Sequence, residues 1–213
     1  MINEFYKEFK VKDYIESQKL NISSKIDCSL GTNPFLDDNM IQKYVKYASS
    51  LSNQYAVNGY DNLKNVLINF YSNILSKNIG KNNISFGSGT MGIIRNLCEF
   101  LIEQNTKALG IAPQFTRFIS EVELKKGIYE YYKLDKKYNY RFVVDDFLKM
   151  IDKQYSLIYI DNPNNPTGQV IDIQDIEKIA KKANEYGIIV IIDEAYGDYM
   201  QMKNSSISLV RKI

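Results

Sequence analysis

From residue 84 onward, short runs of apolar residues alternate along the chain with segments whose apolar positions recur at helical spacing. Short apolar runs are typical of buried strands, and the i, i+3, i+4 spacing is typical of amphipathic helices. The predicted strands are ISF at 84–86, ALGIAP at 108–113, YYKLD at 131–135, SLIYIDN at 156–162 and GIIVIIDEAY at 187–196. The predicted helices cover 90–103, 115–126, 143–151 and 172–186.

This alternation predicts β-α-β crossovers and therefore an α/β fold, with a mostly parallel sheet and helices on both faces. The runs at 157–160 and 188–192 are apolar toward both faces, as expected of strands that helices cover on both sides. For the helix over 172–186, Asp172 can cap the start and Gly187 follows the end. Its apolar positions recur at helical spacing: Ile173, Ile176, Ile179, Ala180 and Ala183.

The first 60 residues show less regular patterning. An amphipathic segment covers about 4–16, a loop runs through SLGTNPF at 29–35, and a helix is predicted over roughly Asn62–Ser76. We find no internal repeat and no disordered linker. The pattern thus predicts an irregular, partly helical N-terminal segment, 1–60, followed by an α/β region, 61–213.

The composition suits a chain with a substantial core, since 45% of its 213 residues are apolar. The 27 basic and 25 acidic residues form no long basic run, which argues against nucleic acid as a partner. The longest apolar run, IIVII at 188–192, is far shorter than the roughly 20 residues that span a bilayer, and MINEFYKEFK has no apolar signal core. We therefore expect a cytoplasmic protein that binds neither nucleic acid nor membrane.

Histidine is absent, and Cys28 and Cys98 are the only cysteines. The absence of histidine removes the commonest general base and every Ser-His or Cys-His nucleophilic pair. Two cysteines give neither a disulfide framework nor the paired spacing of a zinc site. Chemistry near neutral pH must then come from Lys, Asp or Tyr, or from a bound cofactor, and we expect no metal.

Gly87, Gly89 and Gly92 lie in ISFGSGTMGIIRNL, between a predicted strand and a predicted helix. A helix N-terminus presents unpaired amides, and glycine lets the backbone approach an anion, so this loop suits a phosphate. A dinucleotide site also needs an acid at the end of the next strand, which here reads APQF. A nucleotide triphosphatase needs GxxxxGK followed by Ser or Thr, which does not occur. Two interpretations of the glycine loop remain: a site for some other phosphate, or a tight turn that binds no ligand.

Two further segments follow predicted strands: DNPNNPTG at 161–168 and DEAY at 193–196. Parallel strands present their carboxyl ends at one edge of a sheet, so both segments are expected at the same edge as the glycine loop. Taken singly, the first also fits a Pro and Asn turn without chemistry, and the second fits a solvated strand end.

With these motifs the chain resembles the pyridoxal-phosphate enzymes of aminotransferase fold type I, nearest to the histidinol-phosphate aminotransferase group. The resemblance runs from SLGTNPF through NQYAVNGYDNL, FGSGTMGII, APQFTRF and NPNNPTG to IIDEAY. It implies pyridoxal 5'-phosphate as cofactor and a homodimer with shared active sites. It also implies an amino acid or amino-acid phosphate ester as substrate and a 2-oxo acid as acceptor. Residues 1–60 then correspond to an N-terminal arm and part of the small domain with dimer contacts, and 61–213 to a partial large domain.

The resemblance implies roles for four residues around the cofactor ring. Asp193 matches the carboxylate that pairs with the pyridine nitrogen and keeps it protonated, so that the ring can act as an electron sink. Asn165 and Tyr196 match the groups that hydrogen-bond the ring oxygen. Phe115 matches the aromatic residue that stacks on the ring face.

The phosphate end of the cofactor is assigned by the same resemblance. Gly89, Thr90 and Met91 match the phosphate-binding turn, with backbone amides and the Thr90 hydroxyl as donors. Relatives often carry a polar or acidic residue in place of Met91, which can donate only through its backbone. Tyr55 matches a tyrosine that reaches the phosphate of the neighbouring subunit.

The substrate side of the expected site is less complete. Gly31, Thr32 and Asn33 match a stretch near the substrate carboxylate. The family's catalytic lysine, which binds the cofactor covalently, follows a serine beyond DEAY, and neither Lys203 nor Lys212 has that context. The catalytic residue is thus unknown, and we expect weak cofactor binding and little or no transamination from this chain alone.

Several alternatives stay open. The chain is expected to be truncated: a fragment, the product of a disrupted gene, or half of a split enzyme with a complementary C-terminal chain. In the family, strands beyond DEAY separate 188–192 from 84–86, so an open edge is expected at 188–192. A threonine-phosphate decarboxylase uses the same scaffold and is one alternative. A non-catalytic remnant that binds a partner chain or a phosphate ligand is another. An NAD-dependent oxidoreductase is a third, although this chain lacks the acid that would hold the ribose.

Overall fold

The computed structural model describes residues 37–210 except 54, 56–59 and 76–78. The described residues fall into two compact units, 37–67 and 68–210. The predicted segments at 4–16 and 29–35, with Gly31, Thr32 and Asn33, lie outside the described residues.

The first unit contains helix α2, Asp38–Ser49, which begins where the Asp37 carboxylate accepts a hydrogen bond from the Asn39 amide at 2.9 Å. The sequence patterning of residues 1–60 did not predict this helix. Its signal is nevertheless present, since apolar residues recur at helical spacing: Met40, Ile41, Tyr44, Val45 and Ala48. Helix α3, Asp61–Leu75, confirms the helix predicted over 62–76 and continues into the second unit.

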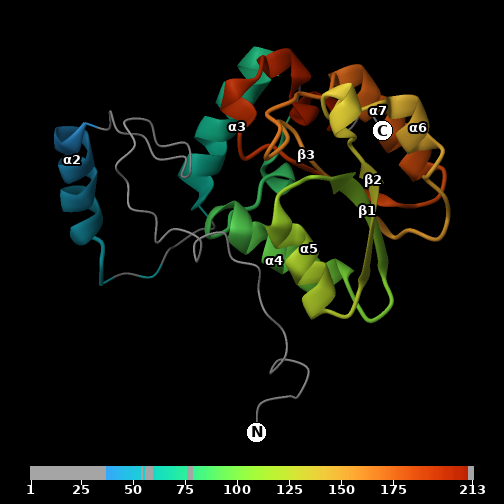
Figure 1. Ribbon diagram of the computed structural model, residues 1–213. Helices are drawn as coiled ribbons and strands as arrows, with labels where there is room; N and C mark the ends of the chain where they lie inside the picture. The colour runs from blue at the N-terminus through green and yellow to red at the C-terminus, as the bar shows by residue number, and fades with distance from the viewer. Residues whose placement is uncertain (1–36, 54, 56–59, 76–78, 211–213) are drawn as a thin grey trace, which may run out of the picture. The chain divides into compact units, whose positions relative to one another are not determined.

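The second unit is built on a four-stranded sheet in the order β2-β1-β3-β4, with every pair parallel (Figure 1). The strands are β1 Lys107–Ala112, β2 Ile128–Lys133, β3 Leu157–Asp161 and β4 Ile189–Asp193. Each strand is followed along the chain by a helical segment, as β-α-β crossovers require. The parallel sheet predicted from the alternating pattern is thereby confirmed.

Helices cover both faces of this sheet (Figure 1). On one face α4, Gly89–Leu101, and α5, Thr116–Leu124, enclose a core that includes Ala108 of β1 and Tyr159 of β3. On the other, α6, Val144–Leu148, and α7, Ile173–Asn184, pack over Leu109 and Ile160. Neighbouring residues of one strand thus serve opposite faces, as the period of two requires.

Helix α7 begins and ends where the sequence predicted. The Asp172 carboxylate accepts a hydrogen bond from the Gln174 amide at 2.9 Å, which satisfies one of the amides that a helix start leaves unpaired. Gly187 follows with φ of +69°, a conformation that glycine adopts without the strain a side chain would bring.

The strand predicted at 84–86 needs correction. Residues 84–86 form no strand and lead instead from the short helix η3, Lys81–Asn83, into α4. A strand needs a neighbour, and within the described residues the sheet ends at β4, which pairs with β3 alone. Strand β4 is covered less fully than β3: Val190 and Ile192 pack against the core beside α6 and α7, and Ile191 packs against the core beside α4 and α5, but Ile189 is 46% exposed, whereas every residue of β3 is buried. In the part of the chain that the structure describes, β4 has the expected open edge.

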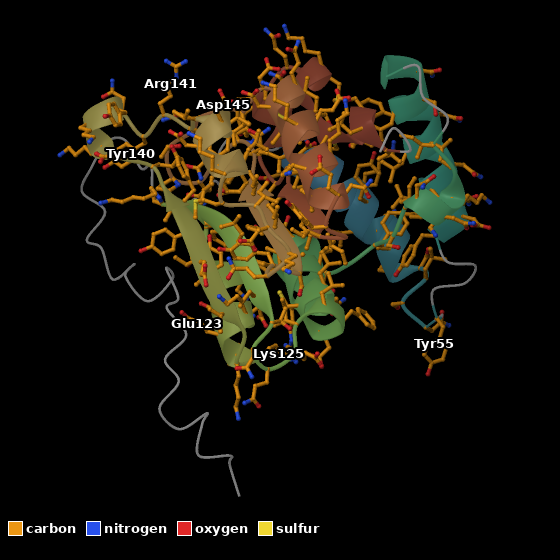
Figure 2. The ribbon with its side chains drawn as sticks, turned by 90° about the vertical axis from the view of Figure 1, so that its right-hand side faces the viewer. Tyr55, Glu123, Lys125, Tyr140, Arg141 and Asp145 are labelled. Atoms are coloured by element: carbon orange, nitrogen blue, oxygen red, sulfur yellow. The ribbon has the colours of Figure 1, made fainter. Side chains whose placement is uncertain are left out.

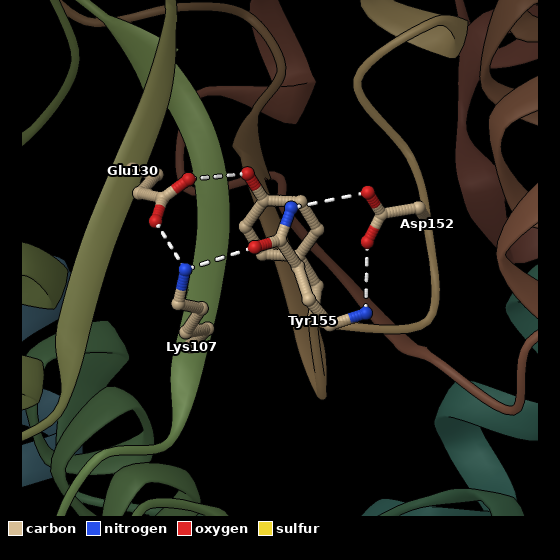
Figure 3. A network of polar contacts seen from close by, with 5 residues as sticks. Lys107, Glu130, Asp152 and Tyr155 are labelled. Atoms are coloured by element: carbon tan, nitrogen blue, oxygen red, sulfur yellow. Dashed lines mark hydrogen bonds and ion pairs between the residues drawn. The ribbon is translucent and has the colours of Figure 1, made fainter.

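Polar side chains join β1, β2 and the segment that precedes β3 (Figure 3). The Lys107 ammonium on β1 lies 2.8 Å from both Glu130 Oε1 on β2 and Gln154 Oε1, and the Tyr155 hydroxyl donates to Glu130 Oε2 at 2.5 Å. Asp152 accepts from the backbone and side chain of Gln154. This Lys107 network therefore ties β1 and β2 to the segment that enters β3.

The segment after β4 folds back through Glu194. Its carboxylate accepts hydrogen bonds from the Ser205 hydroxyl at 2.7 Å and from the Ser206 amide and hydroxyl at 2.6 Å each. Leu209, farther along this segment, packs against the core beside α7. This segment contains three short helices, η5 Gly197–Tyr199, η6 Met202–Asn204 and η7 Ser206–Leu209. A further short helix, η4 Lys136–Tyr138, lies elsewhere in the chain, before α6.

Charged side chains lie on the periphery of the second unit. Arg141 and Asp145, around the start of α6, project away from the sheet, and Glu123 and Lys125 lie around the end of α5 (Figure 2). None of the helices in the described part of the chain is long and apolar enough to cross a membrane.

Candidate active site

The final residues of two neighbouring strands carry carboxylates side by side. Asp161 ends β3 and Asp193 ends β4, and the two are partners in the parallel register. The Asn162 amide continues the ladder by donating to the Asp193 carbonyl at 2.9 Å. Ligands bind parallel sheets at this carboxyl edge, so these two acids mark the candidate active site.

Asp193 is held by a buried tyrosine on the adjacent strand. The Tyr159 hydroxyl donates to Asp193 Oδ2 at 2.6 Å, and the Ala195 amide donates to Oδ1 at 2.9 Å. Tyr159 is fully buried, and its ring stacks on Phe118 with centroids 4.0 Å apart and planes 3° from parallel. Burial, aided by the neighbouring carboxylates, raises the pKa of Tyr159 far above its ordinary value, so its hydroxyl remains a donor. Asp193 therefore has a fixed orientation.

Asp161 joins two loops at the same edge. Its carboxylate accepts the Phe115 amide at 3.2 Å, the Asn165 amide at 2.8 Å and the Asn164 side-chain amide at 2.9 Å. Burial raises the pKa of this carboxyl, and the three hydrogen bonds act in the opposite direction.

The loop 162–168 is ordered by its own asparagines. The Asn162 side-chain amide donates to the Ile171 carbonyl at 3.1 Å, and Asn162 Oδ1 accepts from the Ile171 backbone amide at 2.8 Å. The side chain of Asn164 accepts from Thr167 and donates to the Pro113 carbonyl at 3.1 Å, which ties this loop to the end of β1. Asn165 is half-buried, and its side-chain amide makes no hydrogen bond to any other described residue. That amide is available to a ligand.

The glycine turn leads into α4. Gly89 has φ of +68° with open space where a side chain would begin, and α4 starts at this residue. Ser88 precedes it without capping the helix through its side chain. The Gly89 amide donates to the Gly87 carbonyl at 3.0 Å, whereas the Thr90 and Met91 amides have no partner within α4. Thr90 is half-buried and Met91 is 39% exposed. This helix start can bind an anion through backbone amides and the Thr90 hydroxyl.

These residues fit the three parts of pyridoxal 5'-phosphate. The first turn of α4 suits the phosphate, Phe115 and Asn165 suit the ring face and ring oxygen, and Asp193 suits a protonated ring nitrogen. Asp161 connects Phe115 with Asn165, and the strand register connects Asp161 with Asp193. Helix α4 packs on the same face of the sheet through Ile94 and Cys98.

Among the described residues, Tyr196, Tyr55 and Lys203 make no hydrogen bond to the side chains of this group. Tyr196, 42% exposed, has its ring 6.4 Å from that of Tyr199. Tyr55 is 96% exposed and belongs to the first compact unit. Lys203 lies exposed in η6. The described residues contain no cluster of His, Cys, Asp and Glu that could hold a metal ion.

Sequence reasoning missed Tyr159 and Asp161. Asp161 was part of the DNPNNPTG motif but received no role, and Tyr159 was counted only as part of an apolar strand. The signal was their spacing: residues two apart on a strand share a face, so both belong to the face that ends at the site.

Solved structures define the class of the fold. YbdL from Escherichia coli, described as having a methionine aminotransferase function, aligns with a TM-score of 0.70 over 81% of this chain and 46% of its own, at 18% identity. The apo-BacF structure from Bacillus subtilis gives 0.68 over 84% of this chain and 46% of its own, at 24% identity. The second unit thus has the α/β fold of aminotransferases.

The chain belongs to the aminotransferase class I and II family, whose model matches residues 24–212. It is 35% identical to a histidinol-phosphate aminotransferase from Methanococcus aeolicus over 123 residues, which are 57% of this chain and 32% of that relative. It is 26% identical to an aspartate aminotransferase from Bacillus sp. strain YM-2 over 159 residues, 75% of this chain and 39% of the relative. The matches therefore span less than half of either relative's length.

Proposed function

We propose that this chain binds pyridoxal 5'-phosphate and contributes to the transamination of an amino acid or amino-acid phosphate ester, in the manner of a histidinol-phosphate aminotransferase. The observation that carries the proposal is the orientation of Asp193 by Tyr159 at the strand ends, beside the Phe115 and Asn165 loops that Asp161 joins. Because the relatives found are aminotransferases, transamination is favoured over the decarboxylase alternative.

When bound, the cofactor supplies an electron sink for charge at the substrate carbon. Asp193 holds a proton at the ring nitrogen through its carboxylate. Phe115 stacks on the ring, and Asn165, with Tyr196, donates to the ring oxygen. Thr90 and the first-turn amides of α4 hold the phosphate.

Neither Lys203 nor Lys212 has the sequence context of the lysine that transamination needs, so the proposal assigns that role to no residue of this sequence. We therefore expect weak cofactor binding and little or no transamination from this chain alone. The proposal includes a homodimer, with Tyr55 reaching the neighbouring phosphate, or else a complementary C-terminal chain, and a cytoplasmic location. Native mass measurement separates a homodimer from a complex of two different chains.

Pyridoxamine 5'-phosphate tests the proposal because it needs no lysine for binding. We expect calorimetric titration to give saturable binding to the unmodified chain. Asp193→Ala should weaken it by at least about tenfold, since a hydrogen bond to a charged group is lost, and Thr90→Ala should weaken it less. Asp198→Ala, an exposed acid in the same segment, is the matched control and should bind like the unmodified chain. No binding, or equal loss in all three variants, would contradict the proposal.

A further inference from the structure

Asp161 receives hydrogen bonds from two different loops through a single oxygen atom. Asp161 Oδ2 accepts the Phe115 amide at 3.2 Å and the Asn165 amide at 2.8 Å. Phe115 is the last residue of the turn from β1 into α5, whereas Asn165 lies in the loop after β3, 50 positions later in the sequence. The second oxygen, Oδ1, accepts from the side chain of Asn164 at 2.9 Å.

This carboxylate is in an unfavourable environment for a charge. Asp161 is 4% exposed, and no Lys or Arg forms an ion pair with it among the described residues. A buried carboxylate without a cation is costly unless donors surround it, and here three donors do so. The hydrogen bonds therefore stabilise both the charge and the relative placement of the two loops.

The two backbone amides belong to the residues that the proposed function assigns to the face and to the ring oxygen of the cofactor. A shift of either loop would stretch its bond to Oδ2, so the loops cannot move independently without loss of a charge-assisted hydrogen bond. Residues whose geometry must be maintained to a fraction of an ångström are commonly supported in this way by neighbours that do not touch the ligand.

We propose that Asp161 is a positioning residue that couples Phe115 to Asn165, so that the stacking ring and the ring-oxygen donor approach the cofactor as one unit. This inference rests on the proposed function. Asp161 itself need not contact the cofactor, since its carboxylate is occupied by the three donors.

Asp161→Asn is the primary test, because it keeps the side-chain shape and removes the charge. The matched control is Asp172→Asn, which alters another carboxylate that accepts a backbone amide, at the start of α7. The first measurement is amide hydrogen exchange by NMR on the chain without ligand. We expect the Phe115 and Asn165 amides to exchange about tenfold faster together in Asp161→Asn, as expected for loss of a bond to a charged acceptor. The Ile171 amide, held by Asn162, should not change.

The second measurement is the dissociation constant of pyridoxamine 5'-phosphate. We expect Asp161→Asn to raise it about tenfold and Asp172→Asn to leave it unchanged. If only one of the two amides loosens, or if the affinity falls no more than in Asp172→Asn, the coupling role is wrong. If the unmodified chain binds no pyridoxamine 5'-phosphate, the proposed function fails, whereas the exchange rates still decide whether Asp161 couples the loops. Should Asp161→Asn not fold, Asp161→Ser replaces it under the same criteria.

Discussion

Tyr159 donates its hydroxyl hydrogen to Asp193 across the β3–β4 pair, with 2.6 Å between the two oxygens. The phenol is buried against Phe118, and the carboxylate ends the last strand of the described sheet. An aromatic side chain of the core thereby determines the orientation of the acid that the proposed cofactor requires.

Removing this hydroxyl should weaken cofactor binding while leaving the core packed. In Tyr159→Phe the ring stack with Phe118 is kept, and Asp193 loses one of its two recorded donors. We expect the dissociation constant of pyridoxamine 5'-phosphate to rise on the order of tenfold. Tyr186→Phe, on a surface tyrosine at the end of α7, is the control and should bind normally. Equal affinity in Tyr159→Phe and the unmodified chain would show that the hydroxyl has no part in binding.

Buried acidic groups of the core should make the protein sensitive to alkali. Burial raises the pKa of the Cys98 thiol to about 12 and that of Tyr159 far above its ordinary value. Because the unfolded chain loses these protons at lower pH than the folded chain, the stability they contribute is complete below the unfolded pKa, near 9.0 for the thiol, and is lost as pH rises toward the folded value.

Urea unfolding at several pH values measures this effect. Each such group should lower the free energy of unfolding by about 1.4 kcal/mol per pH unit within its window. Cys98→Ala should therefore show a shallower decline between pH 9 and 12 than the unmodified chain. An identical pH dependence in the two proteins would contradict the assigned burial of the thiol.

Two glycine substitutions should differ in cost. A Cβ at Gly110 would lie 2.2 Å from the Tyr129 hydroxyl oxygen and 2.9 Å from Gln114 Oε1. Both of those groups hydrogen-bond the backbone of Ile111, so Gly110→Ala should reduce the free energy of unfolding by about 1–3 kcal/mol. At Gly168 the space is open and only φ of +70° opposes a side chain, so Gly168→Ala should cost about 1 kcal/mol. Thermal unfolding of both variants measures which substitution costs more. A larger loss of stability in Gly168→Ala than in Gly110→Ala would contradict the prediction.

The Lys107 network should affect stability without affecting the site. Tyr155→Phe removes the hydrogen bond to Glu130 and should lower the free energy of unfolding by about 1 kcal/mol. Because Lys107 begins β1 and Tyr155 precedes β3, whereas Asp161 and Asp193 end their strands, the affinity for pyridoxamine 5'-phosphate should not change. A loss of affinity in the folded Tyr155→Phe variant would show that the two regions are linked.

The order and kind of the elements in the second unit could be predicted because their periodicity is local. The apolar pattern and the caps Asp172 and Gly187 define α7 without reference to the rest of the chain. The failed strand at 84–86 shows the limit of such local patterns, since a strand exists only beside a partner and none is present within the described residues.

The candidate site was predictable in its residue types but not in its connections. Asp193, Asn165 and Phe115 could be named from motifs, whereas their neighbours depend on strand register, which no local pattern contains. Tyr159 meets Asp193 only because β3 and β4 pair Tyr159 with Ile191 and Asp161 with Asp193. The role of Asp161 likewise requires knowing that the turn after β1 and the loop after β3 lie within reach of one carboxylate.

In the described chain β4 has a strand neighbour on one side only, so its alignment depends on β3 alone. A slip of one residue along β3 would exchange the two faces of the strand and carry Asp193 to the side covered by α6 and α7. The hydrogen bonds that the Tyr159 hydroxyl and the Asn162 amide donate to Asp193 form only in the observed alignment. These two hydrogen bonds therefore stabilise the alignment that presents an acid to the site, relative to an alignment shifted by one residue.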